Sequence, residues 1–265
     1  MPGESEEHQE YTDEFVAGLE CMWGDGFLSP GGAEEVAAIL EPAEVEGLEI
    51  LDVGCGLGAV DCLLVAEHGA ARVVGIDIEA PLIERARAAV AGAGLADRVE
   101  IRLVEPGPLP FDPGSFDVVF SKDSIIHVPD KSALFAEVLR VLRPGGCFVA
   151  SDWLRGGEGP VPSALRAWLD IVGLTFEMEN LEQMGARLGR AGFTDVRLRD
   201  RNAWYREEIR REVEAIAGDG HAQLAARVGE TEARRRVRSN AARQAAVEAG
   251  DLRPAHLYGR KPVRA

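Results

Sequence analysis

The stretch LDVGCGLG, residues 51–58, places three glycines, Gly54, Gly56 and Gly58, within five positions. Glycine loses more conformational freedom on folding than any other residue, so a cluster of glycines is typical of a sharp turn or of a backbone that a ligand approaches closely. An acidic residue, Asp52, precedes the cluster. This stretch is therefore a candidate ligand-binding turn.

Segments with strand patterns alternate with segments of helical pattern around this turn. The predicted strands are residues 48–55, 72–78, 99–105, 115–123 and 147–153, and the predicted helices are residues 58–70, 80–94 and 131–146. Strands and helices that alternate at this spacing form right-handed βαβ units. The sequence therefore predicts an α/β fold in which helices cover both faces of a parallel sheet.

The pattern changes after about residue 153. Helices are predicted over 163–176 and 179–192, a strand over 193–202, and a long, charge-rich helical stretch over 205–248. We interpret this later half as a helical lobe that packs on the sheet, rather than as an independent domain.

Composition narrows the range of partners and compartments. The 265 residues have a formal net charge of −16, which argues against nucleic-acid or anionic-membrane partners because both attract clustered lysine and arginine. Four cysteines without CxxC spacing indicate free thiols in a reducing compartment. The first residues do not resemble a signal peptide, and no apolar run approaches the ~20 residues that cross a bilayer. We expect a cytoplasmic monomer or homodimer without a metal site.

The glycine turn lies where parallel sheets bind ligands, outside the carboxyl ends of the strands. Helix amides are free just after such a turn. Asp77, at the end of the second predicted strand, can accept hydrogen bonds from both hydroxyls of a ribose. Asp52 can order the turn or face a ligand amine. An ordinary tight turn between strand and helix is the alternative.

A nicotinamide-dependent dehydrogenase is the competing interpretation of the turn. Its fingerprint, G-x-G-x-x-G, presents the amino end of a helix to a pyrophosphate. Here Val60 and Asp61 stand where that motif would continue, and a carboxylate there would repel a diphosphate. A ligand that has a ribose but no phosphate fits better.

Four motifs, LDVGCGLG, GIDI, LPFDPGSFDVVFS and VLRPGG, follow one another within residues 48–152. Their order and spacing resemble those of class I S-adenosylmethionine-dependent methyltransferases, which implies a Rossmann-like fold and S-adenosylmethionine as the cofactor. The resemblance also implies a set of contacts: the methionine end against Asp52, Gly54, Gly56 and Gly58, the ribose and adenine against Asp77 and Ile78, and the adenine amino group near Glu105 and Pro106, where the family more often has Asp-Ala.

A narrower resemblance covers two further segments. Residues 9–32, QEYTDEFVAGLECMWGDGFLSPGG, and residues 121–128, SKDSIIHV, are similar to the N-terminal lid and to the segment after the fourth strand in phosphoethanolamine N-methyltransferases. This implies cofactor contacts from Leu28, Ser29, Ser121 and Lys122, and a catalytic pair of Tyr11 and His127 beside Asp123. It divides the chain into a tail with lid helices (1–47), a cofactor-binding core (48–153) and a region that completes the core and forms a substrate lobe (154–265).

The chemistry of methyl transfer accounts for the proposed pair. Displacement at a sulfonium is a single step that requires alignment in a dry pocket. An amine must first lose a proton, which histidine accepts near neutral pH. If residues 121–128 make a helical turn, Asp123 and His127 share one face, so the acid can orient the ring and stabilise its charged form. Alternatively, His127 caps the following loop and Tyr11 is a packing anchor.

The substrate end departs from the phosphoethanolamine enzymes. That family binds the substrate phosphate with several tyrosines, an arginine and a lysine, whereas this chain offers Trp153 and Trp168, and Arg238 is the nearest counterpart of the lysine. Tryptophans suit a cationic or apolar group, with plain packing as the alternative. We predict N-methylation of a small amine, either a phosphobase or a glycine-like amino acid. S- or O-methylation of another small molecule, or an inactive cofactor-binding scaffold, are the alternatives.

Overall fold

The computed structural model describes residues 11–174 and 176–263, so the first part of the predicted tail lies outside the described residues. In chain order the elements are α1 (Asp13–Trp23), α2 (Gly32–Leu40), β1 (Glu49–Val53), α3 (Ala59–Ala66), β2 (Arg72–Asp77), α4 (Ala80–Gly92), β3 (Val99–Leu103), β4 (Phe116–Lys122), the 3₁₀ helix η1 (Ile125–His127), α5 (Lys131–Val141), β5 (Leu142–Arg155), α6 (Ser163–Val172), α7 (Leu181–Ala191), β6 (Thr194–Asp200), α8 (Asn202–Ala215), α9 (Asp219–Val228), α10 (Glu230–Ala249) and β7 (Leu252–Arg260). Every strand and helix predicted within 48–153 is present, with ends that differ by a few residues.

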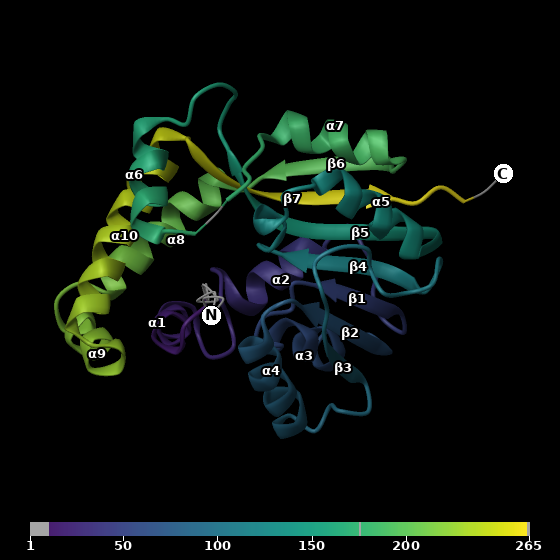
Figure 1. Ribbon diagram of the computed structural model, residues 1–265, viewed down its shortest axis with the longest axis horizontal. Helices are drawn as coiled ribbons and strands as arrows, with labels where there is room; N and C mark the ends of the chain where they lie inside the picture. The colour runs from purple at the N-terminus through teal and green to yellow at the C-terminus, as the bar shows by residue number, and fades with distance from the viewer. Residues whose placement is uncertain (1–10, 175, 264–265) are drawn as a thin grey trace, which may run out of the picture.

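The strands form one sheet in the order β3-β2-β1-β4-β5-β7-β6 (Figure 1). Strands β1 to β5 are parallel, as the alternation predicts, and β7 pairs antiparallel with both β5 and β6. From β1 the chain moves outward to β2 and β3, and then returns to place β4 on the other side of β1. Because this reversal is a topological switch point, a ligand site is expected at the carboxyl ends of β1 and β4.

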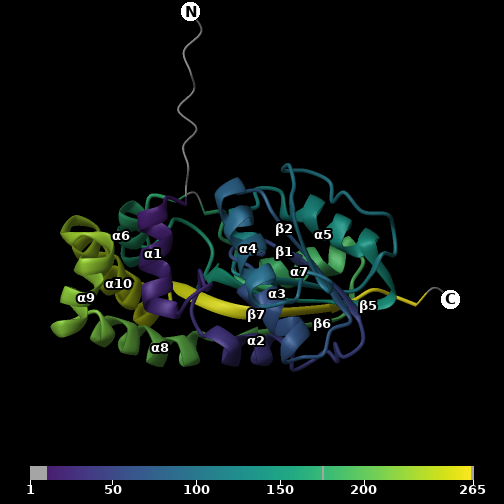
Figure 2. The ribbon, with the colours of Figure 1, turned by 90° about the horizontal axis from the view of Figure 1, so that it is seen from below.

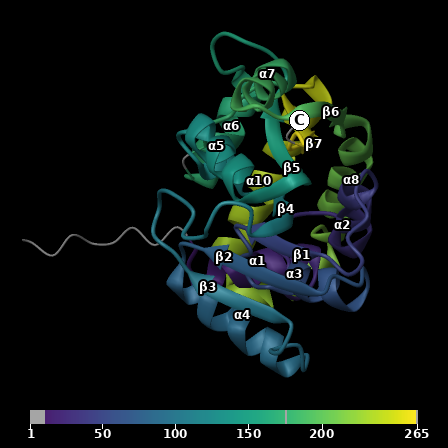
Figure 3. The same ribbon diagram turned by 90° about the vertical axis from the view of Figure 1, so that its right-hand side faces the viewer.

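Helices cover both faces of the sheet, and Figure 3 shows α2 and α5 on opposite sides of it. Helices α2, α3 and α4 pack on the face that carries Ile50 of β1. Helices α5 and α7 pack on the face that carries its neighbour Leu51. Successive residues of a strand point to opposite faces, so β1 needs apolar residues at successive positions.

Three features differ from the sequence-based expectations. The helix predicted over 131–146 ends at Val141, and the strand that follows includes the Pro-Gly-Gly sequence. The stretch 205–248 is divided into three helices, because Gly218 and Gly229 adopt φ angles of 55° and 84° that do not continue a helix. Strand β7 is absent from the sequence-based expectations, which assign no element after residue 248, and it includes Pro254.

Helices α6, α8, α9 and α10 gather beyond one end of the sheet (Figures 1 and 2). The core shared by α6, α8 and α10 includes Trp153, Trp168 and Tyr205, and α9 packs in a separate cluster with Ile216 and Ala233. Helix α1 packs against α9 and α10, and its Val16 also packs against Leu57 of the glycine turn. Helix α1 therefore bridges the helical lobe and the turn after β1. Within the described residues, no helix combines the length and the apolar character that crossing a membrane requires.

Candidate active site

The turn after β1 adopts backbone conformations that favour glycine. Gly54, Gly56 and Gly58 have φ angles of 81°, 54° and 79°, which lie in the left-handed region. A Cβ atom on Gly54 would lie 2.3 Å from the Ser124 side chain, and a Cβ atom on Gly56 would lie 3.0 Å from Leu28 Cδ1. The turn is therefore held between the segment after β4 and the segment after α1, without space for side chains at Gly54.

Asp77, the last residue of β2, stabilises the same turn. Its Oδ2 accepts a hydrogen bond from the Gly56 N–H at 2.9 Å, and its Oδ1 accepts one from the Glu79 N–H at 3.0 Å. Burial raises the pKa of Asp77, and these backbone donors oppose the shift. The next residue, Ile78, is 53% exposed. A carboxylate and an open apolar side chain thus lie side by side at the carboxyl end of β2.

Asp52 is buried within β1, next to the glycine turn. Its Oδ1 has no hydrogen-bond partner among the described residues. Burial, with Asp77 nearby, raises the pKa of Asp52 to about 8. A buried acceptor without a partner fits a ligand that donates a hydrogen bond, such as an amine or a hydroxyl group. Glu105 and Pro106 are exposed in the loop after β3, the strand beside β2.

Lys122, the last residue of β4, joins this edge of the sheet to the segment that follows α1. Its Nζ donates to Ser29 Oγ at 2.5 Å, to the Pro30 carbonyl at 2.9 Å and to Asp123 Oδ2 at 3.0 Å. The neighbouring Ser121 donates from Oγ to the carbonyl that ends β1, at 2.8 Å. Both residues therefore hold segments that surround the glycine turn.

Tyr11 and His127 are brought together from distant parts of the chain. Tyr11 Oη lies 3.3 Å from His127 Nε2, and the two rings pack edge to face with centroids 6.3 Å apart. Burial lowers the pKa of His127 to about 4, and the charge of Lys131 adds to this shift. The imidazole is therefore neutral at pH 7, and the same burial makes it a weaker base than an exposed histidine.

Asp123 does not share a helical face with His127. The 3₁₀ helix covers only Ile125–His127, and Asp123 has a left-handed φ of 56° that separates it from that turn. Its carboxylate accepts hydrogen bonds from Ser151 Oγ at 2.9 Å and from Lys122. The predicted helical turn is wrong. Burial and the charge of Lys131 lower the pKa of His127, so stabilisation of its charged form by Asp123 stays a prediction.

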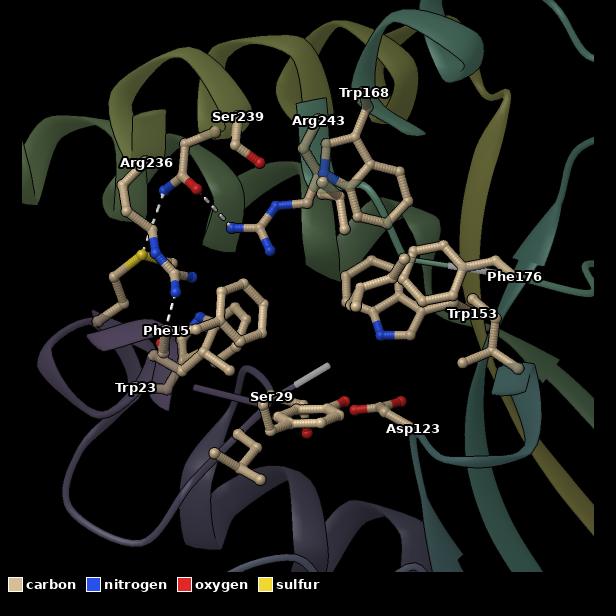
Figure 4. Close-up of a pocket in the computed structure, with 18 of the residues that line it drawn as sticks. Phe15, Trp23, Ser29, Asp123, Trp153, Trp168, Phe176, Arg236, Ser239 and Arg243 are labelled. Carbon is tan, nitrogen blue, oxygen red and sulfur yellow. Dashed lines mark hydrogen bonds between the residues drawn. The ribbon is translucent and has the colours of Figure 1, made fainter. Parts of the chain in front are cut away.

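Aromatic side chains form one wall of a pocket beside Tyr11 and His127 (Figure 4). Trp153 of β5 and Trp168 of α6 have ring centroids 6.1 Å apart, and Trp168 stacks on Phe176 at 5.6 Å. Phe176 in turn lies 5.2 Å from the His127 ring. Both tryptophans are more than nine-tenths buried and belong to the core of the helical lobe. They therefore pack the lobe and line the pocket at once.

Arginines of α10 line another side of the pocket, where Figure 4 shows Arg236 and Arg243. Arg235 belongs to the same lining. The structure does not bring Arg238 into the pocket, because its side chain is exposed and lies outside the lining. An α-helix has 3.6 residues per turn, so positions 236 and 243 share a face from which position 238 is turned away.

Helix α1 supplies lining residues that the sequence analysis missed. They are Phe15, Leu19, Met22 and Trp23, and α10 adds Ser239 and Asn240. The spacing of these residues could have grouped them within each helix, because residues three, four or seven positions apart share a helical face. Such a pattern identifies a face but does not say what the face contacts, which depends on how the helices pack.

Comparison with known proteins gives matches across the chain. A family model for a methyltransferase domain matches residues 51–150. Phosphoethanolamine N-methyltransferase 1 of Arabidopsis thaliana is 32% identical over 208 residues, which are 78% of this chain and 41% of that protein. Methyltransferase GfsG of Streptomyces halstedii is 32% identical over 175 residues, which are 65% of this chain and 63% of that protein.

A solved structure resembles the whole arrangement. Haemonchus contortus phosphoethanolamine N-methyltransferase 2, in complex with phosphomonomethylethanolamine and S-adenosylhomocysteine, matches with a TM-score of 0.87 at 25% identity, over 96% of this chain and 58% of that chain. This chain spans less than half the length of the Arabidopsis relative. Residues 51–150 are a methyltransferase domain. The described chain has the class I Rossmann-like fold of methyltransferases, and it resembles phosphoethanolamine N-methyltransferases.

Proposed function

We propose that this protein transfers a methyl group from S-adenosylmethionine to the nitrogen of a small amine, either a phosphobase or a glycine-like amino acid. The observation that carries the proposal is the Tyr11–His127 pair, which lines a pocket next to the glycine turn. Leu28 and Asp123 connect the pocket to the glycine turn, since both residues line the pocket. Leu28 also approaches Gly56, and Asp123 directly precedes the serine that packs on the turn.

The edge of the sheet fits the proposed cofactor. When bound, S-adenosylmethionine supplies a methyl group activated by the positive charge on its sulfur. The unpartnered Asp52 Oδ1 would accept a hydrogen bond from the cofactor's amino group, and Asp77 would accept hydrogen bonds from its ribose. The exposed Ile78 would pack against the adenine. Leu28 and Ser29, which Lys122 holds in place, would cover the site.

His127 would accept the proton that the amine loses. Its ring is neutral at pH 7, because burial lowers its pKa to about 4, and Tyr11 Oη lies against its Nε2. The aromatic wall keeps water from the reacting atoms, which a displacement reaction requires. A thioether acceptor has no proton to lose. The pair therefore favours a nitrogen acceptor over a sulfur acceptor.

The experiment that tests the proposal is a panel of acceptors, scored by release of S-adenosylhomocysteine from S-adenosylmethionine. The panel contains phosphoethanolamine, ethanolamine, glycine, sarcosine and dimethylglycine. Turnover of at least one of these amines is expected. Cofactor binding without turnover of any amine would contradict N-methylation and would point to the scaffold or to another acceptor atom.

We also propose a cytoplasmic location, which the four cysteines support because all are free. Free thiols persist in reducing compartments. The expectations that the protein is a monomer or a homodimer and has no nucleic-acid partner stay predictions from the sequence.

A further inference from the structure

The side of the pocket formed by α10 holds arginines that are already paired. Glu232 accepts hydrogen bonds from Arg235 Nε at 2.6 Å and from Arg236 Nε at 2.9 Å. Glu212 of α8 accepts a hydrogen bond from Arg243 at 2.5 Å. Two carboxylates therefore offset most of the charge of three guanidinium groups.

Glu212 is held as a carboxylate within this network. One of its oxygens accepts from Arg243, and the other accepts from Trp23 Nε1 at 2.9 Å. Burial raises the pKa of Glu212, and Arg243 and Trp23 oppose the shift. A buried guanidinium that lost its carboxylate partner would destabilise the fold strongly. A guanidinium on one oxygen and an indole N–H on the other are the contacts of an ionised carboxylate, so both members of the Glu212–Arg243 pair are counted as charged.

The remaining charged groups of the pocket form a neutral pair. Lys122 and Asp123 lie 3.0 Å apart, and both side chains are more than nine-tenths buried. His127 is neutral at pH 7 because its pKa is lowered to about 4. Among the described residues that line the pocket and their direct ion-pair partners, four cations thus face three carboxylates, and the one positive charge left lies at α10.

A buried donor at α10 also lacks a partner. Arg243 Nε makes no hydrogen bond to any described residue. The faces of the guanidinium groups are covered, because Arg236 lies 4.4 Å from the Phe15 ring centroid and Arg243 lies 5.2 Å from that of Trp23. An anion can therefore reach these arginines only at their edges. A buried unsatisfied donor is costly unless a ligand supplies the acceptor.

We infer that the acceptor amine carries a single negative charge, as an amino-acid carboxylate does, and that this group binds at the edges of Arg236 and Arg243. The inference rests on the proposed function and names its substrate class. A phosphate monoester carries about 1.5 to 2 negative charges at pH 7, of which the pocket matches only one. No cationic side chain among the described residues of the pocket is left to pair with the excess, which makes its burial costly. The resemblance to phosphoethanolamine enzymes therefore does not extend to the charge of the substrate.

The test compares two matched series of acceptors by kcat/KM, again by S-adenosylhomocysteine release. Glycine, sarcosine and dimethylglycine form the carboxylate series, and phosphoethanolamine with its N-methyl and N,N-dimethyl derivatives forms the phosphate series. The best carboxylate should exceed the best phosphate by about tenfold or more. A higher value for the phosphate series overturns the inference and leaves N-methylation intact. Turnover of neither series overturns both.

A pair of charge variants on α10 separates the pocket from the overall charge of the protein. Glu232→Gln removes a carboxylate that offsets two pocket arginines. Glu230→Gln removes the same charge from an exposed pair with Arg234 on the same helix. Relative to wild type, Glu232→Gln should shift the phosphate-to-carboxylate ratio of kcat/KM upward by about tenfold, and Glu230→Gln should leave it unchanged.

Equal shifts in the two variants, or no shift in a folded Glu232→Gln protein, would overturn the inference. Thermal melting confirms that each variant is folded. If Glu232→Gln does not fold, the comparison of the two acceptor series in the wild-type protein decides the question.

Discussion

The two ends of the candidate site are built in different ways. The end at the glycine turn consists of backbone and short side chains at the ends of neighbouring strands, such as Asp52, Asp77 and Ser121. The end that faces the helical lobe consists of long side chains from α1, β5, α6 and α10, such as Trp23 and Arg243, together with Tyr11, which precedes α1. Strand register fixes the first end, and helix packing fixes the second. Substitutions at the two ends should therefore have separable effects on cofactor affinity and acceptor turnover.

The largest effect is expected from His127→Ala, at the acceptor end. If His127 accepts the amine proton, kcat should fall by roughly 10²–10⁴, the typical contribution of general acid–base catalysis. The dissociation constant of S-adenosylmethionine, measured by calorimetry, should not change, because the proposed cofactor contacts lie at the other end. His221→Ala, which alters a histidine paired with Glu230 at the surface, is the matched control.

The pH dependence sharpens this prediction. Burial and Lys131 lower the pKa of His127 to about 4, so the ring is neutral throughout pH 6–9 and its titration contributes no inflection there. The loss of kcat in His127→Ala should shrink as pH rises towards the pKa of the acceptor's own amine, because free amine then becomes available without a base. A near-normal kcat in His127→Ala at pH 7, or a wild-type inflection near pH 6.5 that the substitution removes, would contradict the proposed state of the base.

Asp77→Ala is expected to have the opposite effect to His127→Ala, weaker cofactor binding with little change in kcat. Loss of the carboxylate that would accept ribose hydrogen bonds, and that orders Gly56, should weaken S-adenosylmethionine binding by about 1.5–3 kcal/mol, the usual value for hydrogen bonds to a charged group. The kcat at saturating cofactor should change much less. Asp97→Ala, at an exposed acid, serves as the control. Unchanged affinity in folded Asp77→Ala protein would remove Asp77 from the cofactor site.

A smaller effect is expected on the free energy of unfolding, which a buried acid near the glycine turn should lower. Asp61 of α3 is fully buried, and neither carboxylate oxygen has a hydrogen-bond partner among the described residues. Burial, followed by the charge of Asp52, raises its pKa well above the usual value. The folded state therefore holds a proton that the unfolded state has released, so stability falls as pH rises above the unfolded pKa, by up to about 1.4 kcal/mol per pH unit.

Asp61→Asn removes this linkage. Its advantage over wild type in the free energy of unfolding, measured by urea denaturation without cofactor, should grow between pH 5 and pH 8. Asp97→Asn should show no such growth, since that side chain is exposed. A constant difference between Asp61→Asn and wild type across this range would mean that Asp61 is ionised in the fold.

The same contrast explains how much of the molecule could be predicted from its sequence. The parallel part of the sheet and the turn at Gly54, Gly56 and Gly58 follow local rules of periodicity and backbone conformation, and the structure agrees with them. The residues assigned to the cofactor lie along one edge because the carboxyl ends of parallel strands meet there. Local pattern is sufficient where the fold repeats a simple unit.

Local pattern fails where distant segments meet. Residues 252–260 form an internal strand despite Pro254, because pairing with β5 and β6 on both sides outweighs the propensity of one residue. Arg238 corresponds to the family's lysine by its place in the chain alone, whereas the rotation of α10 turns Arg236 and Arg243 into the pocket instead. The pairing of Tyr11 with His127 was expected only from family resemblance, since no spacing rule links residues so far apart.

The smallest effect concerns Trp168, which both packs the lobe and lines the pocket. If its ring contacts a cationic or alkylated amine, Trp168→Leu should raise the acceptor KM by roughly fivefold, which corresponds to about 1 kcal/mol for a cation–π contact. Trp168→Phe keeps an aromatic face and should raise KM less. Both substitutions create space in the core, so both should lower the melting temperature.

The comparison of these two variants distinguishes contact from packing. A contact with the acceptor predicts that KM follows the loss of the aromatic face, while cofactor affinity stays constant. Plain packing predicts that kinetic changes follow the loss of stability, so the two variants would differ in KM only as far as they differ in melting temperature. Normal kinetics in a destabilised Trp168→Leu protein would assign Trp168 to the core alone, and the acceptor end would then rely on Tyr11, His127 and the arginines of α10.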